Sequence, residues 1–309
     1  MIGYGGHAGV YRAQHAQLRY PVAIKTLAGC RGSSLEDELR GRLLTEAEIG
    51  ALVRHPNVLE IFDVGRTPDD DPYLVMELVD GETLRERLNR GVFTIAQVVD
   101  FALQALSGLS AIARHGIVHR DIKPSNLMLR PTERGIQVKL IDLGVARRVS
   151  HEDNPGSEEF LIGTPNYMAP EQLRAQAVDP RADLFSLGVV LYEALTGSVP
   201  PRPTFVERYA LEPELSIEEL PPLRKRCPEC PFLLDAIIRK ATALEREARY
   251  PNPAMMAEAL AILARDLDVP SGARAWLEPF ASPSFTISSI ASSSERLATR
   301  PERAHARRV

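Results

Sequence analysis

The octapeptide HRDIKPSN at residues 119–126 constrains this chain more than any other stretch. Asp121, Lys123 and Asn126 place a carboxylate, an ammonium and an amide within six residues. Together these groups can accept a proton from an attacking hydroxyl, neutralise a phosphate and offer an oxygen to a metal ion. His-Arg-Asp alone is also compatible with a solvated turn, but the added lysine and asparagine make that interpretation the weaker one. The chain therefore has to fold so that this candidate catalytic loop is held in a fixed geometry.

Composition favours a globular protein, which we expect to be cytoplasmic. The chain has 309 residues, of which 44% are hydrophobic and 25% are charged, so it can hold two compact units. Its formal net charge of −4 does not favour nucleic acid as a partner, and the basic residues near the C-terminus are interpreted as a solvated tail. The sequence contains no apolar run of about eighteen residues and opens on glycines rather than on an apolar leader, so we expect no membrane span.

The three cysteines are too few for a disulfide framework, which fits a reducing compartment. Cys227 and Cys230 have the spacing of zinc ligands, but a structural zinc site needs four ligands and the sequence has no second pair. We therefore expect no zinc site.

The first eighty residues read as strands with one helix. Residues 2–11 alternate as strand, glycine turn and strand, and glycines let backbone amides approach phosphates closely. Residues 22–25 read as a short apolar strand ending in Lys25, whose burial would be costly without a partner. Glu46, on a helix predicted over about 35–53, is the candidate partner, and a surface ion pair is the alternative. Residues 74–79 read as a buried strand that breaks into a connector between two lobes.

A long helix leads into the candidate loop. Apolar residues recur every three or four positions over 94–115, which predicts an amphipathic helix, and Gly116 is its expected stop. After the loop, residues 138–144 read as a strand that ends in an acid and a glycine. A plain turn cap is the alternative reading of that acid, Asp142.

The remaining segments predict a mostly helical second half. Residues 183–195 are apolar nearly all round, which indicates a buried helix. Further apolar periodicity predicts helices over about 231–244 and 253–266. Residues 271–309 contain many Ser and Arg and few large apolar groups, so we expect a flexible tail there.

Taken in order, these segments resemble the signature motifs of the protein kinases. The resemblance is closest to the bacterial eukaryotic-like, or Hanks-type, serine/threonine kinases. It implies an α+β, bilobal fold, in which a small antiparallel-sheet N-lobe with one helix (1–79) precedes a larger, mostly helical C-lobe (80–270). The matching stretches are the glycine-rich residues 3–10 with Ala8 at the third glycine, V-A-I-K at 22–25, H-R-D at 119–121, D-L-G at 142–144 and G-T-P-N-Y-M-A-P-E at 163–171.

The resemblance implies ATP as phosphoryl donor with Mg²⁺, and it assigns a role to each motif residue. Lys25 would hold the ATP phosphates and pair with Glu46, whereas Asp121 would take the proton of the acceptor hydroxyl beside Lys123. Mg²⁺ would be held by Asn126 and Asp142. The ATP pocket would be lined by Ile2, Gly3, Gly5, Val10, Ala23, Lys25, Met76, Glu77, Val79 and Met128.

The segment from Asp142 to Glu171 resembles a kinase activation segment. Thr164 would reach the catalytic aspartate and lysine, which favours Ser or Thr hydroxyls as acceptors. The arginine before the catalytic aspartate usually pairs with a phosphate on this segment. Its candidate phosphate acceptors are Ser150 and Ser157, with Ser157 preferred, and the rival hypothesis is that a nearby carboxylate already fills the arginine pocket.

Other residues receive structural roles. By resemblance, Asp183 braces the catalytic loop from below, and Glu171 pairs with Arg249. Gly50 lies one turn beyond Glu46, where a larger apolar residue would lock the helix against the core. We therefore predict that this helix moves easily and that activity depends on a force that pushes it inward.

The function favoured by the sequence is a serine/threonine protein kinase that phosphorylates protein substrates and itself, which leaves room for a homodimer. The first alternative is a pseudokinase that acts as a binding scaffold, and it is kept because of Gly50 and because only two residues precede Gly3. That short start suggests a truncated or unusually short first strand, with weaker nucleotide binding. The second alternative is a small-molecule phosphotransferase, which the A-P-E segment argues against.

Overall fold

The computed structural model describes residues 2–5, 8–27, 36–133, 135–148, 164–199 and 220–267. All of these belong to the first of the two units into which the chain divides, Met1–Trp276. The second unit, Leu277–Val309, lies outside the described residues, and so does the whole tail predicted from residue 271.

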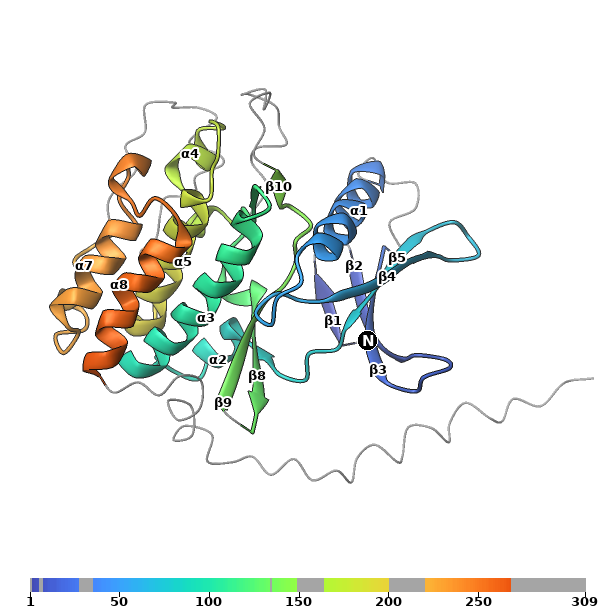
Figure 1. The fold of residues 1–309 in the computed structure, drawn as a ribbon, viewed down its shortest axis with the longest axis horizontal. Coiled ribbons are helices and arrows are strands. Elements are labelled where there is room, and N and C mark those ends of the chain that lie inside the picture. The colour runs from blue at the N-terminus through green and yellow to red at the C-terminus, as the bar shows by residue number, and fades with distance from the viewer. Residues whose placement is uncertain are drawn as a thin grey trace, which may run out of the picture. The chain divides into compact units, whose positions relative to one another are not determined.

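Five strands form the N-lobe sheet, and all neighbours pair antiparallel (Figure 1). The strands are β1 (Gly3–Gly5), β2 (Ala8–Gln14), β3 (Pro21–Thr26), β4 (Ile61–Arg66) and β5 (Pro72–Glu77), in the order β1-β2-β3-β5-β4. Val10 lies opposite Lys25 and Arg12 lies opposite Ala23. Because residues two apart in a strand share a face, these four side chains lie on the same face of the sheet.

The helix predicted over about 35–53 is present as α1 (Glu36–Leu52), and it packs on β4 and β5. Its inward residue Leu43 is buried together with Ala8, Leu27 and Leu74. This small apolar cluster fixes α1 to the sheet, because each fully buried Leu side chain contributes about 1.5–3 kcal/mol relative to exposure.

The central C-lobe helix is α3 (Ile95–Ala113), as the apolar spacing predicted. Thr94 and Gln97 form a capping box, in which the Thr94 hydroxyl accepts from the Gln97 amide and the Gln97 side chain accepts from the Thr94 amide. Gly116, with φ of +68°, follows its end. In the described part of the chain, α3 is the helix long and apolar enough to cross a membrane, and 67% of its apolar stretch is buried inside the protein.

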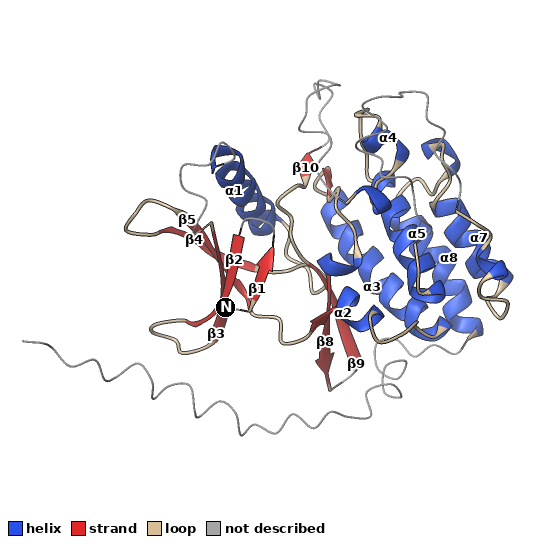
Figure 2. Cartoon of the chain, turned by 180° about the vertical axis from the view of Figure 1, so that it is seen from behind, coloured by secondary structure: helices blue, strands red, loops and turns tan. Residues whose placement is uncertain are grey.

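The other C-lobe helices pack around α3, separate from the N-lobe sheet (Figure 2). α5 lies against both α3 and α7, which explains why its sequence is apolar nearly all round. The described helices here are α2 (Leu84–Leu88), α4 (Pro170–Leu173), α5 (Arg181–Thr196), α7 (Phe232–Ala241) and α8 (Pro253–Asp266), with 3₁₀ turns η1 (Pro124–Asn126), η3 (Pro165–Tyr167), η4 (Leu223–Lys225) and η5 (Arg246–Ala248).

Short strands lie between the N-lobe sheet and these helices. β6 (Glu82–Thr83), β8 (Leu127–Thr132) and β9 (Gly135–Leu140) form one sheet, and β7 (Ile117–Val118) pairs with β10 (Arg147–Arg148). The strand predicted over 138–144 therefore ends earlier, at Leu140. Asp142 has a φ of +64°, in the left-handed region, which no extended strand can contain.

Candidate active site

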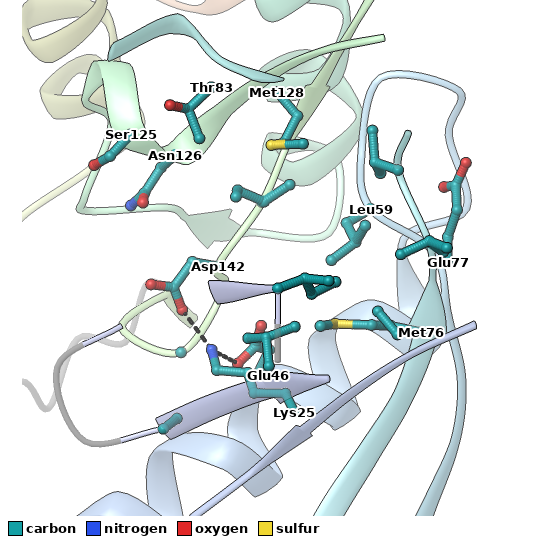
Figure 3. A pocket seen from close by; sticks show the side chains of 18 of the residues that line it. Lys25, Glu46, Leu59, Met76, Glu77, Thr83, Ser125, Asn126, Met128 and Asp142 are labelled. Atoms are coloured by element: carbon teal, nitrogen blue, oxygen red, sulfur yellow. Dashed lines mark hydrogen bonds and ion pairs between the residues drawn. The ribbon is translucent and has the colours of Figure 1, made fainter. Parts of the chain in front are cut away.

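A cavity of about 910 Å³ lies where the N-lobe sheet faces the catalytic loop. The predicted ATP contacts Ile2, Val10, Ala23, Lys25, Met76, Glu77, Val79 and Met128 all line it, and so do Glu46, Asp121, Lys123, Asn126 and Asp142. Gly3 and Gly5 lie in β1. Leu59 and Thr83, which sequence reasoning missed, also line the cavity (Figure 3). Motifs that are more than one hundred positions apart in the sequence thus line the same cavity.

Lys25 on β3 joins the two lobes at this cavity (Figure 3). Its ammonium lies 2.7 Å from Glu46 of α1 and 2.9 Å from Asp142. Burial lowers the pKa of Lys25, but the two carboxylates outweigh it, so the pKa is raised above 10.5 and the side chain stays charged. For Asp142 the two effects have the opposite signs. Burial raises the pKa of this carboxyl, but the Lys25 ammonium lowers it by more, so the pKa of Asp142 is lowered. The pair predicted from the sequence is therefore a three-member cluster.

The catalytic loop holds its polar groups through short local contacts. Lys123 lies 2.6 Å from Asp121, and the Asn126 amide donates to the Asp121 carboxylate at 2.9 Å and to its carbonyl at 2.8 Å. Since both of these partners are acceptors, the Asn126 NH₂ group must face them, and its side-chain oxygen is left for another partner. Asp121 is 8% exposed, so its reach toward a substrate is set by this geometry rather than by side-chain freedom.

Asp183 supports the loop from α5, as the resemblance implied. Its two carboxylate oxygens accept from the backbone amides of His119 and Arg120, each at 2.8 Å. Arg120 has a φ of +68°, a conformation that costs about 1–3 kcal/mol for a residue other than glycine. Gln172, which sequence reasoning missed, donates to the Arg120 carbonyl at 2.8 Å. These bonds hold the backbone in a turn that it would not adopt alone.

Asn126 and Asp142 provide a donor set that fits Mg²⁺. Both line the same cavity, and each presents a hard oxygen ligand of the kind that this ion prefers. The Asp142 side chain is 45% exposed, and only one of its oxygens is within ion-pair distance of Lys25. Magnesium usually takes one or two protein ligands and completes its shell with phosphates and water, so these two residues suffice.

Gly50 lies against β4, which corrects the premise that a larger side chain could fill the space beside it. The prediction that this helix moves easily stays a prediction. A Cβ atom at position 50 would come within 2.4 Å of Ile61 Cδ1 and 2.6 Å of its Cγ1. Ile61 therefore fills the space that a larger residue at position 50 was expected to occupy. With this contact made, Glu46 lies within ion-pair distance of Lys25, so the missing side chain does not leave α1 displaced.

The activation segment is described only in part. Ser150 and Ser157, the proposed phosphate acceptors, lie outside the described residues. Thr164 was expected to reach Asp121 and Lys123, but no hydrogen bond joins its side chain to either within the described ranges. In this structure the Lys123 ammonium pairs with Asp121. The predicted pair Glu171 and Arg249 is present at 2.7 Å.

A polar network beside the end of the activation segment was not predicted from the sequence. Tyr167 donates its hydroxyl to Glu193 of α5 at 2.6 Å, and Arg85 of α2 pairs with the same carboxylate at 2.8 Å. Burial and the bond to Glu193 raise the pKa of Tyr167, so its hydroxyl stays protonated. The only sequence signal was Glu193, a charged residue within a stretch expected to be a helix that is apolar nearly all round.

Comparisons with known proteins agree with this geometry. The family model for the protein kinase domain matches residues 1–240. The serine/threonine-protein kinase PknB of Mycolicibacterium smegmatis is 35% identical over 261 residues, which cover 83% of this chain and 41% of that protein. A probable serine/threonine-protein kinase of Streptomyces coelicolor, SCO3848, is 37% identical and is covered over 37% of its length. The chain thus spans about two fifths of the length of these curated relatives.

A solved structure shows the same fold. The kinase domain of Mycobacterium tuberculosis PknI, crystallised as a double mutant, superposes with a TM-score of 0.65, at 23% sequence identity. The match covers 85% of this chain and 93% of the PknI chain. With the fold, the motif order and the family match in agreement, the chain belongs to the protein kinase domain family, and the relatives that it resembles are bacterial serine/threonine-protein kinases.

Proposed function

We propose that this chain is a serine/threonine protein kinase domain that transfers the γ-phosphoryl group of ATP to Ser or Thr hydroxyls of proteins. The observation that carries the proposal is the convergence of Lys25, Asp121 and Asp142 on one cavity between the lobes. Phosphoryl transfer needs a positioned nucleophile and positive charge around the phosphates, and little covalent chemistry from the protein. The charges that line this cavity supply both.

Each side chain has a defined task in this mechanism. Lys25, held by Glu46, binds the phosphates of ATP, and its raised pKa keeps the ammonium charged at neutral pH. Asp121 orients the acceptor hydroxyl and takes its proton, while Lys123 exchanges its contact with Asp121 for one with the transferred group. Asn126 and Asp142 would hold Mg²⁺, which would supply positive charge against the phosphates.

The purine end of the cavity is apolar. Ala23 and Met76 pack with Leu59 in one buried cluster, and Met128 lies on the other side of the cavity from Met76 (Figure 3). Such a slot suits a flat aromatic base, and main-chain groups at Glu77 and Val79 are available for its polar edge. We therefore assign this end to adenine.

The test is transfer of labelled phosphate from Mg-ATP to the protein itself and to a basic protein acceptor. The Asp121→Asn variant should lower transfer by about 10²–10⁴-fold, because the general base is removed while an amide oxygen at this position can still accept from Asn126. Asp266→Asn, an exposed acid at the end of α8, is the matched control and should leave transfer unchanged. Removal of Mg²⁺ with EDTA should abolish the signal.

Acid hydrolysis of the labelled protein, followed by phosphoamino-acid analysis, completes the test because it identifies which residue type carries the label. Label on Ser or Thr that is lost in Asp121→Asn supports the proposal. Incorporation equal in the two variants would refute the role of Asp121. ATP binding without any transfer by the unsubstituted protein would refute the proposed kinase activity and leave a nucleotide-binding scaffold.

Several finer assignments belong to the same proposal. We propose residues 1–270 as the kinase domain and 271–309 as its tail, Ser157 as an autophosphorylation site and Ser150 as the alternative. Transfer between two copies of the chain would account for such a modification. The free thiols of Cys227 and Cys230 fit a reducing compartment, and ATP as donor is consistent with a cytoplasmic domain.

A further inference from the structure

Glu77 closes β5 and carries an ion cluster that its sequence position does not reveal. Its Oε2 lies 2.7 Å from Lys139 Nζ, and its Oε1 lies 2.9 Å from Arg130 Nη1. Arg130 lies on β8 and Lys139 on β9, so both cations come from the C-lobe hairpin, whereas the carboxylate comes from the last N-lobe strand. We call these three residues the hinge triad.

Burial makes the central pair of the hinge triad costly to break. The side chains of Lys139 and Glu77 are 6% and 16% exposed, whereas that of Arg130 is 41% exposed. Apart from Glu77, the described polar contact of the Lys139 ammonium is a long one of 3.5 Å to the Val58 carbonyl. A buried ammonium requires a counter-charge, and among the described residues Glu77 is the carboxylate that provides it.

The hinge triad lies where three backbone segments meet. The amide of Glu77 donates to the Glu60 carbonyl at 2.9 Å, and the amide of Leu59 donates to the Leu140 carbonyl at 2.9 Å. Lys139 is the cross-strand partner of Met128, which lines the cavity floor. Glu77 therefore links the end of β5 to the segment before β4 through its amide, and to the β8–β9 hairpin through its carboxylate.

The position of Glu77 relative to the cavity suggests how this contact acts. In Figure 3 its side chain lies at the edge of the group drawn, near Met76 and apart from Lys25 and Asp142. The carboxylate is engaged by the C-lobe cations and is not free for the phosphates. Glu77 nevertheless lines the cavity, and it directly follows Met76, which belongs to the apolar cluster with Ala23 and Leu59.

We propose that Glu77 is a positioning residue for nucleotide binding, and that it acts through Lys139 and Arg130. The hinge triad fixes the end of β5, where the connector begins, against the β8–β9 hairpin and thereby sets the width of the slot between Met76 and Met128. This inference rests on the proposed ATP site and adds to it a side chain that does not touch the phosphates.

The test compares Glu77→Gln with Glu60→Gln, since Glu60 is an exposed acid on the adjoining segment. MgATP affinity is measured by titration calorimetry, and KM for ATP and kcat are measured with the same acceptor. Glu77→Gln should raise Kd and KM for MgATP about tenfold, which corresponds to about 1.4 kcal/mol, and should change kcat by less than about twofold. Glu60→Gln should match the unsubstituted protein.

Arg130→Gln keeps the test valid if Glu77→Gln fails to fold, because Arg130 is the exposed member. It should raise KM for MgATP about threefold without changing the thermal midpoint. A normal KM in either folded variant would overturn the inference, as would a loss of kcat at constant KM. If the unsubstituted protein itself does not bind MgATP, the proposed function fails first and this inference falls with it.

Discussion

Arg249 donates to both carboxylate oxygens of Glu171, at 2.7 and 2.8 Å, in a pair that is closed to solvent. The Arg249 side chain is 0% exposed and that of Glu171 is 5% exposed. The remaining guanidinium protons go to the carbonyls of Ala243, Leu244 and Arg181, so all parts of the fork are used. The bidentate pair links the end of the activation segment to the loop that precedes α8.

Glu171→Gln should therefore destabilise the protein by about 3–5 kcal/mol, because it leaves the Arg249 cation buried without its counter-charge. Urea unfolding measures this directly. Glu258→Gln, an exposed acid on α8, is the matched control and should stay within about 0.5 kcal/mol. A Glu171→Gln protein as stable as the control would show that the pair contributes nothing to folding.

Gly50→Ala should lower the free energy of unfolding by about 1–3 kcal/mol and reduce transfer, because its Cβ would overlap Ile61 and push Glu46 from Lys25. Gly41→Ala on the same helix meets nothing within 4 Å and should stabilise by about 0.5–1 kcal/mol. Adding Ile61→Ala to Gly50→Ala should restore part of the activity. The contact is unimportant if Gly50→Ala behaves like Gly41→Ala.

Asp183→Asn should weaken the catalytic loop, because one amide oxygen cannot replace two carboxylate oxygens that accept from the His119 and Arg120 amides. The buried amide left without a partner costs about 1–3 kcal/mol. We expect lower kcat with a smaller change in the KM for ATP, measured beside the Asp266→Asn control. If Asp183→Asn lost the expected stability but kept the kcat of the unsubstituted protein, Asp183 would have a role in folding alone.

Cys227 and Cys230 should resist alkylation in the folded protein. Burial raises the pKa of the Cys227 thiol to about 11 and that of Cys230 to about 12, so neither forms thiolate near pH 8. A Cys30→Ser variant isolates these two thiols, and iodoacetamide should label both only in denaturant. Rapid labelling of the native variant would contradict the burial seen here.

The same pKa values predict a loss of stability in alkali. In the unfolded chain these thiols ionise near 9.0, whereas in the folded protein they keep their protons to about 11 or 12. The unfolded state therefore releases protons first as pH rises, and stability falls across this window. The decline should be smaller in Cys227→Ala, although this variant also loses packing, so slopes against pH and not absolute stabilities are compared.

Much of this fold could be read from apolar spacing and turn residues. The helices α3 and α8 lie within one or two residues of their predicted bounds, because both repeat apolar positions along a buried face. The motif spacing, interpreted through the family resemblance, also predicted 13 of the 29 residues that line the cavity, including its lysines and the acids Glu46, Asp121 and Asp142. Periodicity did not reveal where β9 ends. The backbone turns out of the extended conformation after Leu140, and Asp142 has a positive φ that cannot be predicted from the presence of an aspartate.

Contacts between distant polar residues were not predictable in this way. Glu77 and Lys139 are separated by 62 positions along the printed chain, and nothing in either local pattern points to the other. The space beside Gly50 was misjudged for a related reason. Ile61, which fills it, belongs to a strand whose distance from the helix is a property of the whole N-lobe. Local rules specify elements, whereas these pairings arise only once the elements pack.

The backbone bonds at Leu140 have a consequence for how the protein comes apart. Its amide donates to the Asn57 carbonyl and its carbonyl accepts from the Leu59 amide, both at 2.9 Å. The segment before β4 thus pairs with the end of β9 through backbone hydrogen bonds. If the two lobes separated at the connector, the backbone groups of Asn57, Leu59 and Leu140 would lose these partners. The two lobes should therefore behave as one cooperative unit, and hydrogen exchange at the amides of Leu59 and Leu140 should slow together and reach the protection of global unfolding.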